Sequence, residues 1–163
     1  MRAIYPGAFD PITHGHIDII MRAMDIFDEI HVVVANNTVK NGLFSWGERV
    51  ELIKKSLPAG DKLVVTNHQG LIVDYAQRND INVVLRGLRA VTDFEYELQI
   101  AHYNKALNKK VETFFLMANV EYSFLNSATV KEIAKFGGDV SKFVPKPVEE
   151  ALTIKFKCDK EIF

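Results

Sequence analysis

Short apolar runs alternate with amphipathic runs along most of this chain, and this alternation limits its fold more than any other feature. Runs rich in β-branched and aromatic residues, with the length of buried strands, lie at residues 3–5, 30–35, 62–66, 82–85 and 111–117. The runs between them place apolar residues at helical spacing. Strands that alternate with helices predict an α/β domain with one open, parallel, five-stranded sheet and helices on both faces.

Several helix limits are marked by residues that typically cap helices. Ser45 with Glu48, and Thr92 with Glu95, have the spacing of a capping box and predict two helix starts, the second helix extending to about residue 107. Further helices are predicted at residues 71–78, from near residue 127 to residue 137, and briefly after residue 145, with a frayed tail from about residue 155. Because no linker or repeat interrupts the chain, residues 1–163 are interpreted as one domain.

Composition limits the classes of function. A chain of 163 residues with 48% hydrophobic content is long enough to bury one substantial core. Its net charge of -1 disfavours a nucleic-acid-binding surface, which is typically basic. The single cysteine, Cys158, has no partner for a disulfide, and the sequence shows neither a signal-peptide pattern nor a long uncharged apolar stretch. We therefore expect a cytoplasmic protein with no nucleic-acid partner and no membrane partner.

Residues 5–16, with the sequence YPGAFDPITHGH, stand where the first predicted strand passes into a helix. Gly7 and Gly15 remove side chains at points where a backbone would approach a ligand, and two prolines stiffen the loop. A helix that begins near His16 would direct its unpaired N–H groups into the loop. The loop is therefore interpreted as an anion-binding site that carries imidazole groups.

Polar residues follow other predicted strands as well. Lys40, the turn at residues 86–89 and the loop at residues 122–127 all come just after strands. The carboxyl ends of parallel strands meet at one edge of an open sheet, and ligands bind at that edge. These residues therefore predict one shared cleft.

Each charged candidate also has a structural interpretation. Lys40 is compatible with a solvated loop, and Arg86 and Arg89 are compatible with a surface pair bound to Asp93 or Glu95. Arg86, however, ends an apolar strand beside a glycine, which favours phosphate binding by its forked guanidinium group.

The two histidines of the loop have different interpretations. His16 is compatible with a helix cap, but its place beside Gly15 in this loop favours a functional role. An imidazole with an ordinary pKa of about 6.5 can hydrogen-bond or carry charge near neutral pH. His14 is expected to be exposed and without a role. Because further ligands at metal-binding spacing are missing from the sequence, we expect no metal held by protein side chains.

Three motifs together resemble one enzyme family. Residues 13–16 spell TxGH, residues 86–97 spell RGLRAVTDFEYE and residues 122–127 spell YSFLNS. They are similar to the motifs of the bacterial phosphopantetheine adenylyltransferases, which belong to the nucleotidyltransferase superfamily with a shared (H/T)xGH motif. The resemblance extends from Met1 to about Val148 and implies a Rossmann-like sheet whose first and fourth strands lie side by side.

The resemblance implies an activity and its partners. The family transfers the adenylyl group of ATP to 4'-phosphopantetheine, giving dephospho-coenzyme A and pyrophosphate in the penultimate step of coenzyme A biosynthesis. The acceptor phosphate attacks in line, without a covalent enzyme intermediate, and Mg²⁺ accompanies the ATP. Coenzyme A is expected as a feedback inhibitor, and the assembly is expected to be a homohexamer.

The resemblance also implies roles for individual residues. Catalytic roles fall to His16, which would stabilise the pentacoordinate phosphate, and to Lys40 and Arg89. The residues implied for phosphopantetheine are Ala8, Lys40, Ile72 and Arg86. Those implied for ATP are Ala8, Phe9, His16, Gly87, Leu88, Arg89, Glu97, Tyr122, Ser123, Phe124, Leu125, Asn126, Ser127 and Ala128, although Phe124 is favoured as a core residue rather than a base-stacking one.

Two positions depart from the family pattern. Ala8 stands where the family usually has Ser or Thr, and LNSA at residues 125–128 replaces the usual ISSS. A lost neutral hydrogen bond is worth about 0.5–1.5 kcal/mol, or up to about tenfold in rate, which is small beside the total acceleration of an enzyme. We therefore expect lower efficiency and the same reaction type.

Two other classes of function remain open. A sister nucleotidyltransferase with another phosphorylated acceptor, such as nicotinate mononucleotide or glycerol phosphate, would share TxGH but would not be expected to carry RGLRAVTDFEYE. A nucleotide-binding sensor with reduced turnover is suggested by Ala8 and LNSA. A dinucleotide oxidoreductase is disfavoured because no two of the nine glycines have GxG spacing.

Overall fold

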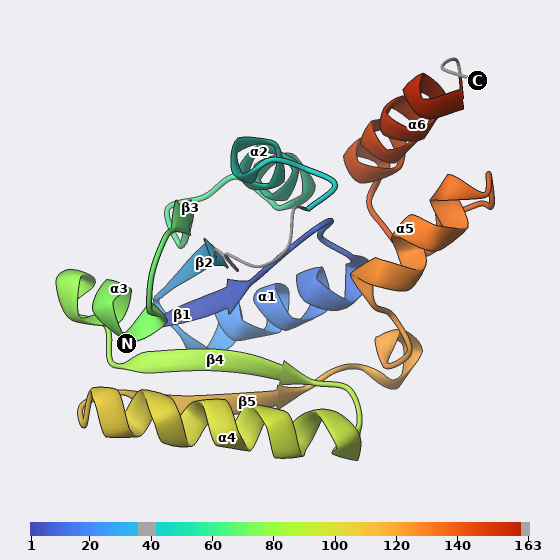
Figure 1. Ribbon diagram of the computed structural model, residues 1–163. Helices are drawn as coiled ribbons and strands as arrows, with labels where there is room; N and C mark the ends of the chain where they lie inside the picture. Colours follow the sequence, from blue (N-terminus) through green and yellow to red (C-terminus); the bar gives the residue numbers. More distant parts are fainter. Residues whose placement is uncertain (36–41, 161–163) are drawn as a thin grey trace.

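The computed structural model describes residues 1–35 and 42–160, and five strands in these residues form one parallel sheet in the order β3-β2-β1-β4-β5 (Figure 1). The strands are β1 (Arg2–Gly7), β2 (Glu29–Ala35), β3 (Leu63–His68), β4 (Val83–Leu88) and β5 (Glu112–Met117). Every registered pair of neighbours is parallel. The predicted parallel α/β sheet is confirmed, and so is the adjacency of its first and fourth strands.

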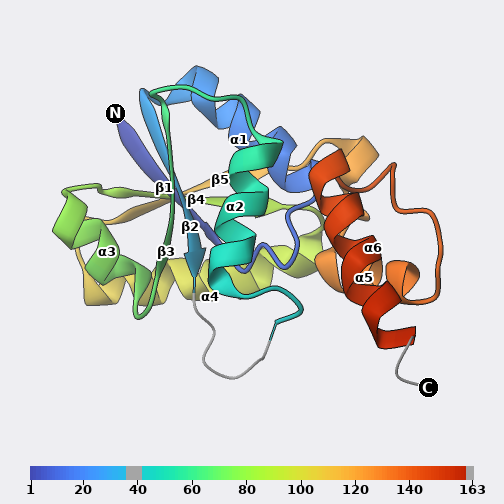
Figure 2. The ribbon, with the colours of Figure 1, turned by 90° about the horizontal axis from the view of Figure 1, so that it is seen from above.

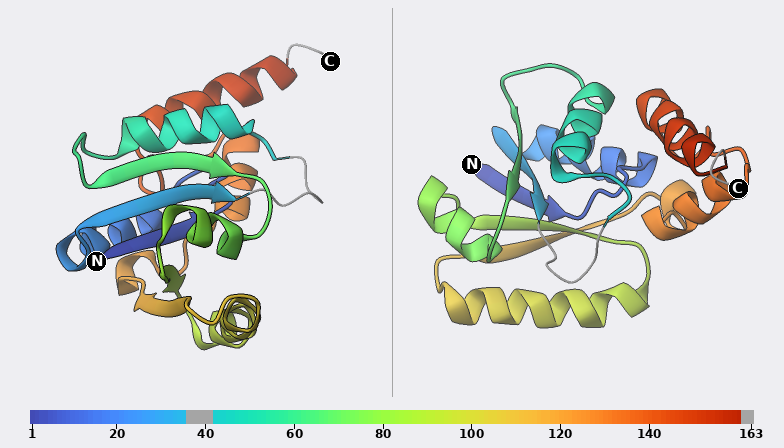
Figure 3. Two further views of the ribbon diagram at one scale, coloured as in Figure 1. Left: turned by 90° about the vertical axis from the view of Figure 1, so that its left-hand side faces the viewer. Right: turned by 45° about the horizontal axis from the view of Figure 1, so that its top comes forward.

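Helices cover both faces of this sheet (Figure 3). The helices are α1 (His14–Ile26), α2 (Trp46–Ser56), α3 (Ile72–Asn79), α4 (Val91–Leu107), α5 (Ser127–Lys135) and α6 (Lys146–Lys160), with one 3-10 turn, η1 (Val120–Tyr122). Helices α1 and α2 lie over one face, and α3 and α4 over the other. Helices α5 and α6 pack against each other, and α6 also lies beside α2 (Figure 2). No helix among the described residues is long and apolar enough to cross a membrane.

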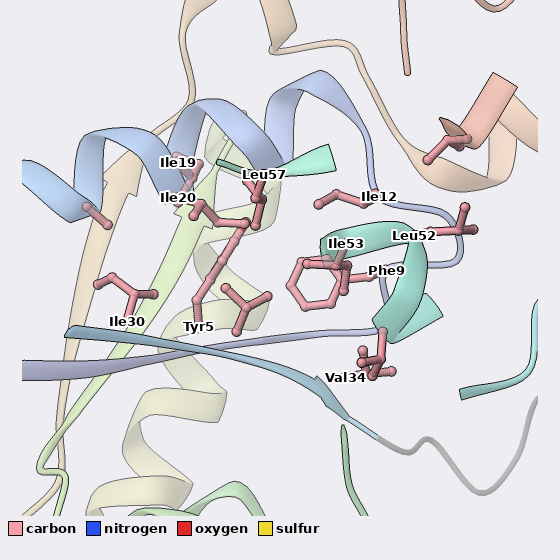
Figure 4. Packing of buried hydrophobic residues seen from close by; sticks show 14 of the residues in the cluster. Tyr5, Phe9, Ile12, Ile19, Ile20, Ile30, Val34, Leu52, Ile53 and Leu57 are labelled. Carbon is pink, nitrogen blue, oxygen red and sulfur yellow. The ribbon is translucent and has the colours of Figure 1, made fainter. Parts of the chain in front are cut away.

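The core has two parts, one on each face of the sheet. The larger part joins β1, β2 and β4 to α1 and α2 and extends to α5 and α6. Figure 4 shows Tyr5 and Phe9 pointing into it from the β1 end. The smaller part lies under α3 and includes Ile4, Val33 and Val84. Five successive residues of β2, from Ile30 to Val34, are buried, as a strand covered on both faces requires.

The strand order reverses between β1 and β4, and their pairing is short. Strands β1 and β2 are in register from Arg2 to Gly7, whereas β1 and β4 share one registered pair, Ile4 with Val84. The two strands therefore diverge toward their carboxyl ends. In open α/β sheets such a reversal is where a ligand crevice forms.

Helix starts differ in how well the sequence predicts them. The capping box of Ser45 and Glu48 is confirmed, because each backbone N–H donates to the other side chain. The box predicted for Thr92 and Glu95 is wrong: Ala90 is the N-cap of α4 and provides no side-chain cap. The helix begins at Val91, which places Thr92 inside its first turn.

Two elements are longer than expected. Strand β4 continues to Leu88, so Arg86 and Gly87 are paired with β5 instead of following the strand. Helix α6 continues through residue 155, where a frayed tail is expected, to Lys160. Its buried residues Val148 and Leu152 belong to the larger core, which explains why the last helix is not short.

Candidate active site

A cavity of about 250 Å³ lies where β1 and β4 diverge. Four segments line it: the end of β1 with the following loop and the first turns of α1, the end of β4 with the turn after it, the first turns of α4, and the residues from the end of β5 to the start of α5. Its lining residues are Tyr5, Pro6, Gly7, Ala8, Phe9, Thr13, Gly15, His16, Ile19, Arg86, Gly87, Arg89, Asp93, Glu97, Ala118, Tyr122, Leu125, Asn126 and Ser127. The cavity therefore unites the TxGH, RGLR and YSFLNS motifs at one edge of the sheet.

The loop from β1 to α1, here called the first loop (residues 8–13), is shaped by the buried ring of Phe9. Phe9 has a positive φ of 44°, and its ring folds back over Gly7, where an added Cβ would lie 2.8 Å from the ring. Gly7 therefore makes room for the Phe9 ring and also lines the cavity. The ring also meets His16 edge-on, with 5.1 Å between centroids.

The start of α1 determines which nitrogen of His16 carries a proton. Helix α1 begins at His14 with Thr13 as its N-cap, two residues before the expected start. His16 takes the place that Glu or Gln occupies in an ordinary capping box, and the Thr13 N–H donates to its Nδ1 at 3.1 Å. A nitrogen that accepts cannot carry the proton of a neutral ring, so the proton lies on Nε2. His16 is therefore a cap and a hydrogen-bond donor together.

His16 is neutral at physiological pH. Burial is the main cause, and the positive charges of Arg89 and Arg86 add to it, lowering the pKa of the imidazole from 6.5 to about 4. The side chain acts here as a neutral donor and does not change its charge near pH 7. Of the two roles expected for this imidazole, hydrogen bonding and carrying charge near neutrality, the lowered pKa favours the first.

Arg86 lies at the end of β4 and is held by two partners. Its Nε and Nη2 both donate to the Glu97 carboxylate, each at 2.6 Å, and its Nη1 donates to the Pro6 carbonyl oxygen at 2.9 Å. Glu97 raises the pKa of Arg86 although burial opposes it. The fork predicted to bind phosphate is thus occupied by Glu97, which itself lines the cavity.

Arg89 is paired in a similar way but is more exposed. Its Nε and Nη2 donate to the two carboxylate oxygens of Asp93 at 3.0 and 3.1 Å, and its Nη1 donates to the Leu125 carbonyl oxygen at 2.9 Å. The Asp93 carboxylate also accepts a hydrogen bond from the backbone N–H of Arg89, close to the start of α4. The structural interpretation of Arg89, pairing with Asp93, is thus present in the structure.

The third side of the cavity is the N-terminus of α5. Asn126 is its N-cap and accepts from the Thr129 N–H at 2.8 Å. The Ser127 hydroxyl donates to the Pro11 carbonyl oxygen at 2.7 Å, which ties this wall to the first loop. The predicted helix start near Ser127 is confirmed.

Several predicted site residues do not line the cavity. Lys40 lies outside the described residues. The others are Ile72, which packs on the smaller core, Leu88, which is buried, and Ser123, Phe124 and Ala128.

Two aromatic side chains of this region differ from their expected settings. Phe124 is 66% exposed and meets Phe143 edge-on, so its assignment as a core residue is wrong. His14 is half-buried rather than exposed. Its backbone N–H donates to the Phe143 carbonyl oxygen at 2.9 Å.

The sequence reasoning missed other parts of the site. Tyr5, Ile19 and Ala118 line the cavity from ordinary strand, helix and loop positions, which carry no signal in one sequence. Thr13 had a signal, because T-x-x-H resembles a capping box with histidine in the last place. Among the described residues, no group of three or more His, Cys, Asp or Glu side chains is arranged to hold a metal ion.

Known proteins similar to this chain include nucleotidyltransferases. Residues 4–133 match the cytidylyltransferase-like family. A phosphopantetheine adenylyltransferase of Syntrophotalea carbinolica is 51% identical over 154 residues, which cover 94% of this chain and 93% of that protein.

Solved structures share the fold at low sequence identity. A bifunctional NMN adenylyltransferase/ADP ribose pyrophosphatase of Francisella tularensis, complexed with AMP and a Mn ion, has a TM-score of 0.69 and 14% identity. The match covers 93% of this chain and 48% of that longer one. Plasmodium falciparum nicotinic acid mononucleotide adenylyltransferase, complexed with APC, has a TM-score of 0.66 and 14% identity, covering 96% and 95% of the two chains.

The identity and coverage of the Syntrophotalea relative and the match over residues 4–133 lead to one conclusion. The chain belongs to the phosphopantetheine adenylyltransferase family, within the cytidylyltransferase-like nucleotidyltransferases.

Proposed function

We propose that this enzyme transfers the adenylyl group of ATP to 4'-phosphopantetheine and releases dephospho-coenzyme A and pyrophosphate. Its family membership supports the reaction class and the acceptor. The observation that carries the assignment of the site is the meeting of His16, Arg86 and Arg89 around one cavity at the divergence of β1 and β4. A site that combines a neutral donor with two guanidinium groups is suited to phosphates.

The proposed step needs no enzyme nucleophile. An oxygen of the acceptor phosphate forms a bond to the α-phosphorus of ATP, and the bond from that phosphorus to the pyrophosphate oxygen breaks. The Nε2–H of His16 would donate to an oxygen of the pentacoordinate phosphorus, where negative charge accumulates. Positioning and stabilisation of charge would supply the acceleration.

We assign the two substrates to different walls of the cavity. ATP would lie along Arg89, Glu97 and the N-terminus of α5, whose unpaired N–H groups favour anions. The acceptor phosphate would lie between Ala8 and Arg86. The family resemblance adds Lys40, which follows β2 in the sequence, and Ile72 at the start of α3. Because both arginines are held by carboxylates, each would exchange part of its pairing for a phosphate.

Mg²⁺ would enter with the nucleotide. The acidic residues that line the cavity, Asp93 and Glu97, are both engaged by arginine, so they do not form an oxygen cage of the kind that holds a bare ion. An ion held mainly by the phosphates of the nucleotide, and not by a cage of protein side chains, would fit this donor set. The ion would neutralise phosphate charge during transfer.

We extend the proposal to assembly and inhibition on the basis of the family resemblance. A homohexamer needs apolar contact surface, and exposed large apolar residues are present on β5 and α4, among them Phe114, Met117, Tyr103 and Leu107. Coenzyme A, which contains the phosphopantetheine group, would compete as an inhibitor. Analytical ultracentrifugation and inhibition assays test these two points.

The defining experiment incubates the purified protein with ATP, 4'-phosphopantetheine and Mg²⁺ and measures pyrophosphate and dephospho-coenzyme A. We expect equal amounts of the two products and no pyrophosphate without the acceptor. Parallel reactions replace the acceptor with nicotinate mononucleotide, or supply CTP with glycerol phosphate. Faster turnover with either replacement, or tight ATP binding without pyrophosphate release, would contradict the proposal.

A further inference from the structure

A buried carboxylate behind the first loop joins three separate segments of the chain. Asp10 is 6% exposed and accepts backbone N–H groups from Leu43 at 3.0 Å and Phe44 at 2.9 Å. The ammonium group of Lys131, on α5, donates to it at 2.7 Å. Arg49, on α2, places its Nε 3.4 Å from Oδ1 of Asp10, whereas Lys131 binds Oδ2. Asp10, Arg49 and Lys131 are called the Asp10 cluster below.

Arg49 connects this cluster to the wall of the cavity. Its side chain is buried, and its Nη1 donates to the Ala8 carbonyl oxygen at 3.1 Å while its Nε donates to that of Phe44 at 2.7 Å. Gly42 leaves room for the guanidinium group, because an added Cβ would lie 1.6 Å from Nη2. The backbone of Ala8, which lines the cavity, is thus held from behind by a charged group.

Lys131 makes a corresponding connection on the other side of the cavity. It lies on α5 one turn after Ser127, which lines the cavity and donates to Pro11 of the first loop. The Asp10–Lys131 ion pair and the Ser127–Pro11 hydrogen bond therefore both join α5 to the first loop. None of the three residues of the Asp10 cluster lines the cavity itself.

The energetics indicate that such a cluster determines geometry more than stability. Burial alone would raise the pKa of the Asp10 carboxyl, but the hydrogen bonds from Lys131, Phe44 and Leu43 and the charge of Arg49 lower it below its usual range. Removing charged groups from water opposes most of what their attraction gains, so a buried ion pair adds little net stability. Its directional contacts still determine how the connected segments are placed.

We propose that Asp10, Arg49 and Lys131 are positioning residues for nucleotidyl transfer, which set the spacing between the first loop and the N-terminus of α5. The inference rests on the proposed function of the cavity and adds residues that act through Ala8 and Ser127. Lys131 aligns the wall assigned to ATP. Arg49 aligns Ala8, where the two substrates would meet.

The first test replaces Lys131 with Met, which keeps the length of the side chain and leaves Asp10 with Arg49 and two N–H donors. We expect the KM for ATP to rise about tenfold while kcat changes less than about threefold, because binding is lost without loss of the reacting groups. Lys131→Arg, which can still reach Asp10, should recover most of the difference. The matched control is Lys54→Met, which removes an exposed ion pair with Glu51 on α2 and should leave both constants unchanged.

A second variant tests Arg49 without changing any charge. Gly42→Ala places a methyl group against the guanidinium, and we expect kcat to fall about tenfold or more as Ala8 is displaced. The mid-point of thermal unfolding is measured for each variant. A purely structural role would lower this mid-point and the amount of active enzyme, and would leave the KM for ATP unchanged.

Binding measurements separate this inference from the proposed reaction. The affinity of a non-hydrolysable ATP analogue for wild type and for Lys131→Met is measured by calorimetry, so that turnover is not needed. Absence of pyrophosphate release by wild type would contradict the proposed reaction only. An unchanged affinity and an unchanged KM in Lys131→Met, or an equal change in Lys54→Met, would overturn the positioning role.

Discussion

The first loop and the turn from β4 to α4 face each other across the cavity, but they prepare for an anion differently. In the first loop the polar groups already have fixed partners: the Thr13 N–H is bound to His16, and the Ala8 carbonyl to Arg49. Beside this loop, at the start of α1, His16 lines the cavity and can offer a neutral donor, its Nε2–H. On the other wall, Arg86 at the end of β4 and Arg89 in the turn after it are bound by Glu97 and Asp93. A phosphate would meet the first wall as it stands, whereas it must displace carboxylates from the second.

This difference follows from charge. A neutral imidazole can line a cavity without a counterion, whereas a partly buried guanidinium needs one. The two walls also affect each other, since Arg89 and Arg86 help to lower the pKa of His16. A bound phosphate brings negative charge that opposes this effect, so the imidazole would be more basic with substrate than without it.

The largest expected effect is the loss of the fixed donor. His16→Ala should lower kcat by about 10²–10³-fold, the usual effect of removing one donor from a developing charge. The affinity for ATP should change only a few-fold, because the arginines and α5 remain. Pyrophosphate release and calorimetry measure the two quantities.

A matched variant separates the two roles of His16. His16→Gln can still accept from the Thr13 N–H, as glutamine does in an ordinary capping box, so its thermal stability should stay near that of wild type. Its activity should remain low. Activity near the wild-type level in either variant would mean that the first wall does not supply the donor.

The neutral state of His16 should be visible as a dependence of stability on pH. Its folded pKa of about 4 lies below the ordinary 6.5, so the unfolded chain binds a proton that the folded protein excludes between these values. Stability is then complete above about pH 6.5 and falls as the pH falls toward 4. Urea unfolding should show a loss of about 2 kcal/mol between pH 7 and pH 5 from this group. His16→Gln should lose less over that range; an equal loss would show that the imidazole is not kept neutral.

The next effect concerns the position at which the first wall lacks a side chain. Ala8 lines the cavity, and Ala8→Ser would add a hydroxyl beside the place proposed for the acceptor phosphate. We expect kcat to rise by up to about tenfold, the value of one hydrogen bond. Steady-state rates at saturating substrates measure it. A fall in kcat would indicate that the wall is already complete in this protein.

The smallest effect tests the second wall. Asp93→Asn removes the charge that competes for Arg89 but keeps an acceptor for its N–H. The KM for ATP should fall about two- to fivefold, because the guanidinium has less to exchange. Glu95→Gln removes the same charge from an exposed position on the same turn and is the control. An equal change in the KM for ATP in both variants would show that the loss of any nearby negative charge is enough, and that the pairing of Asp93 with Arg89 has no specific effect.

The fold was predictable because its signals are local. The β-branched run at residues 30–35 and the capping box at Ser45 each specify an element within a few residues. Their alternation then limits the sheet to a parallel one. The edge of the sheet that carries the cavity was predictable for the same reason, since the polar motifs follow strands. The adjacency of β1 and β4 came from the family resemblance.

The contacts within the site were not predictable, because they join distant segments. Asp10 meets Lys131 across 121 positions, and no local pattern distinguishes it from a solvated aspartate. Arg86 meets Glu97, and that choice depends on how α4 crosses β4. The fold-back of Phe9 over Gly7 requires a positive φ, which sequence patterns indicate for glycine and asparagine and rarely for phenylalanine.

The short pairing of β1 with β4 gives Arg86 a mechanical role. Beyond the pair Ile4 and Val84, strands β1 and β4 separate. There the hydrogen bond from the Arg86 side chain to the Pro6 carbonyl oxygen still connects the two strands. A ligand that draws this guanidinium away would loosen the seam of the sheet. Deleting the side chain would also leave the Glu97 carboxylate without its partner, so the sheet would lose rigidity at this point as well as a proposed phosphate contact.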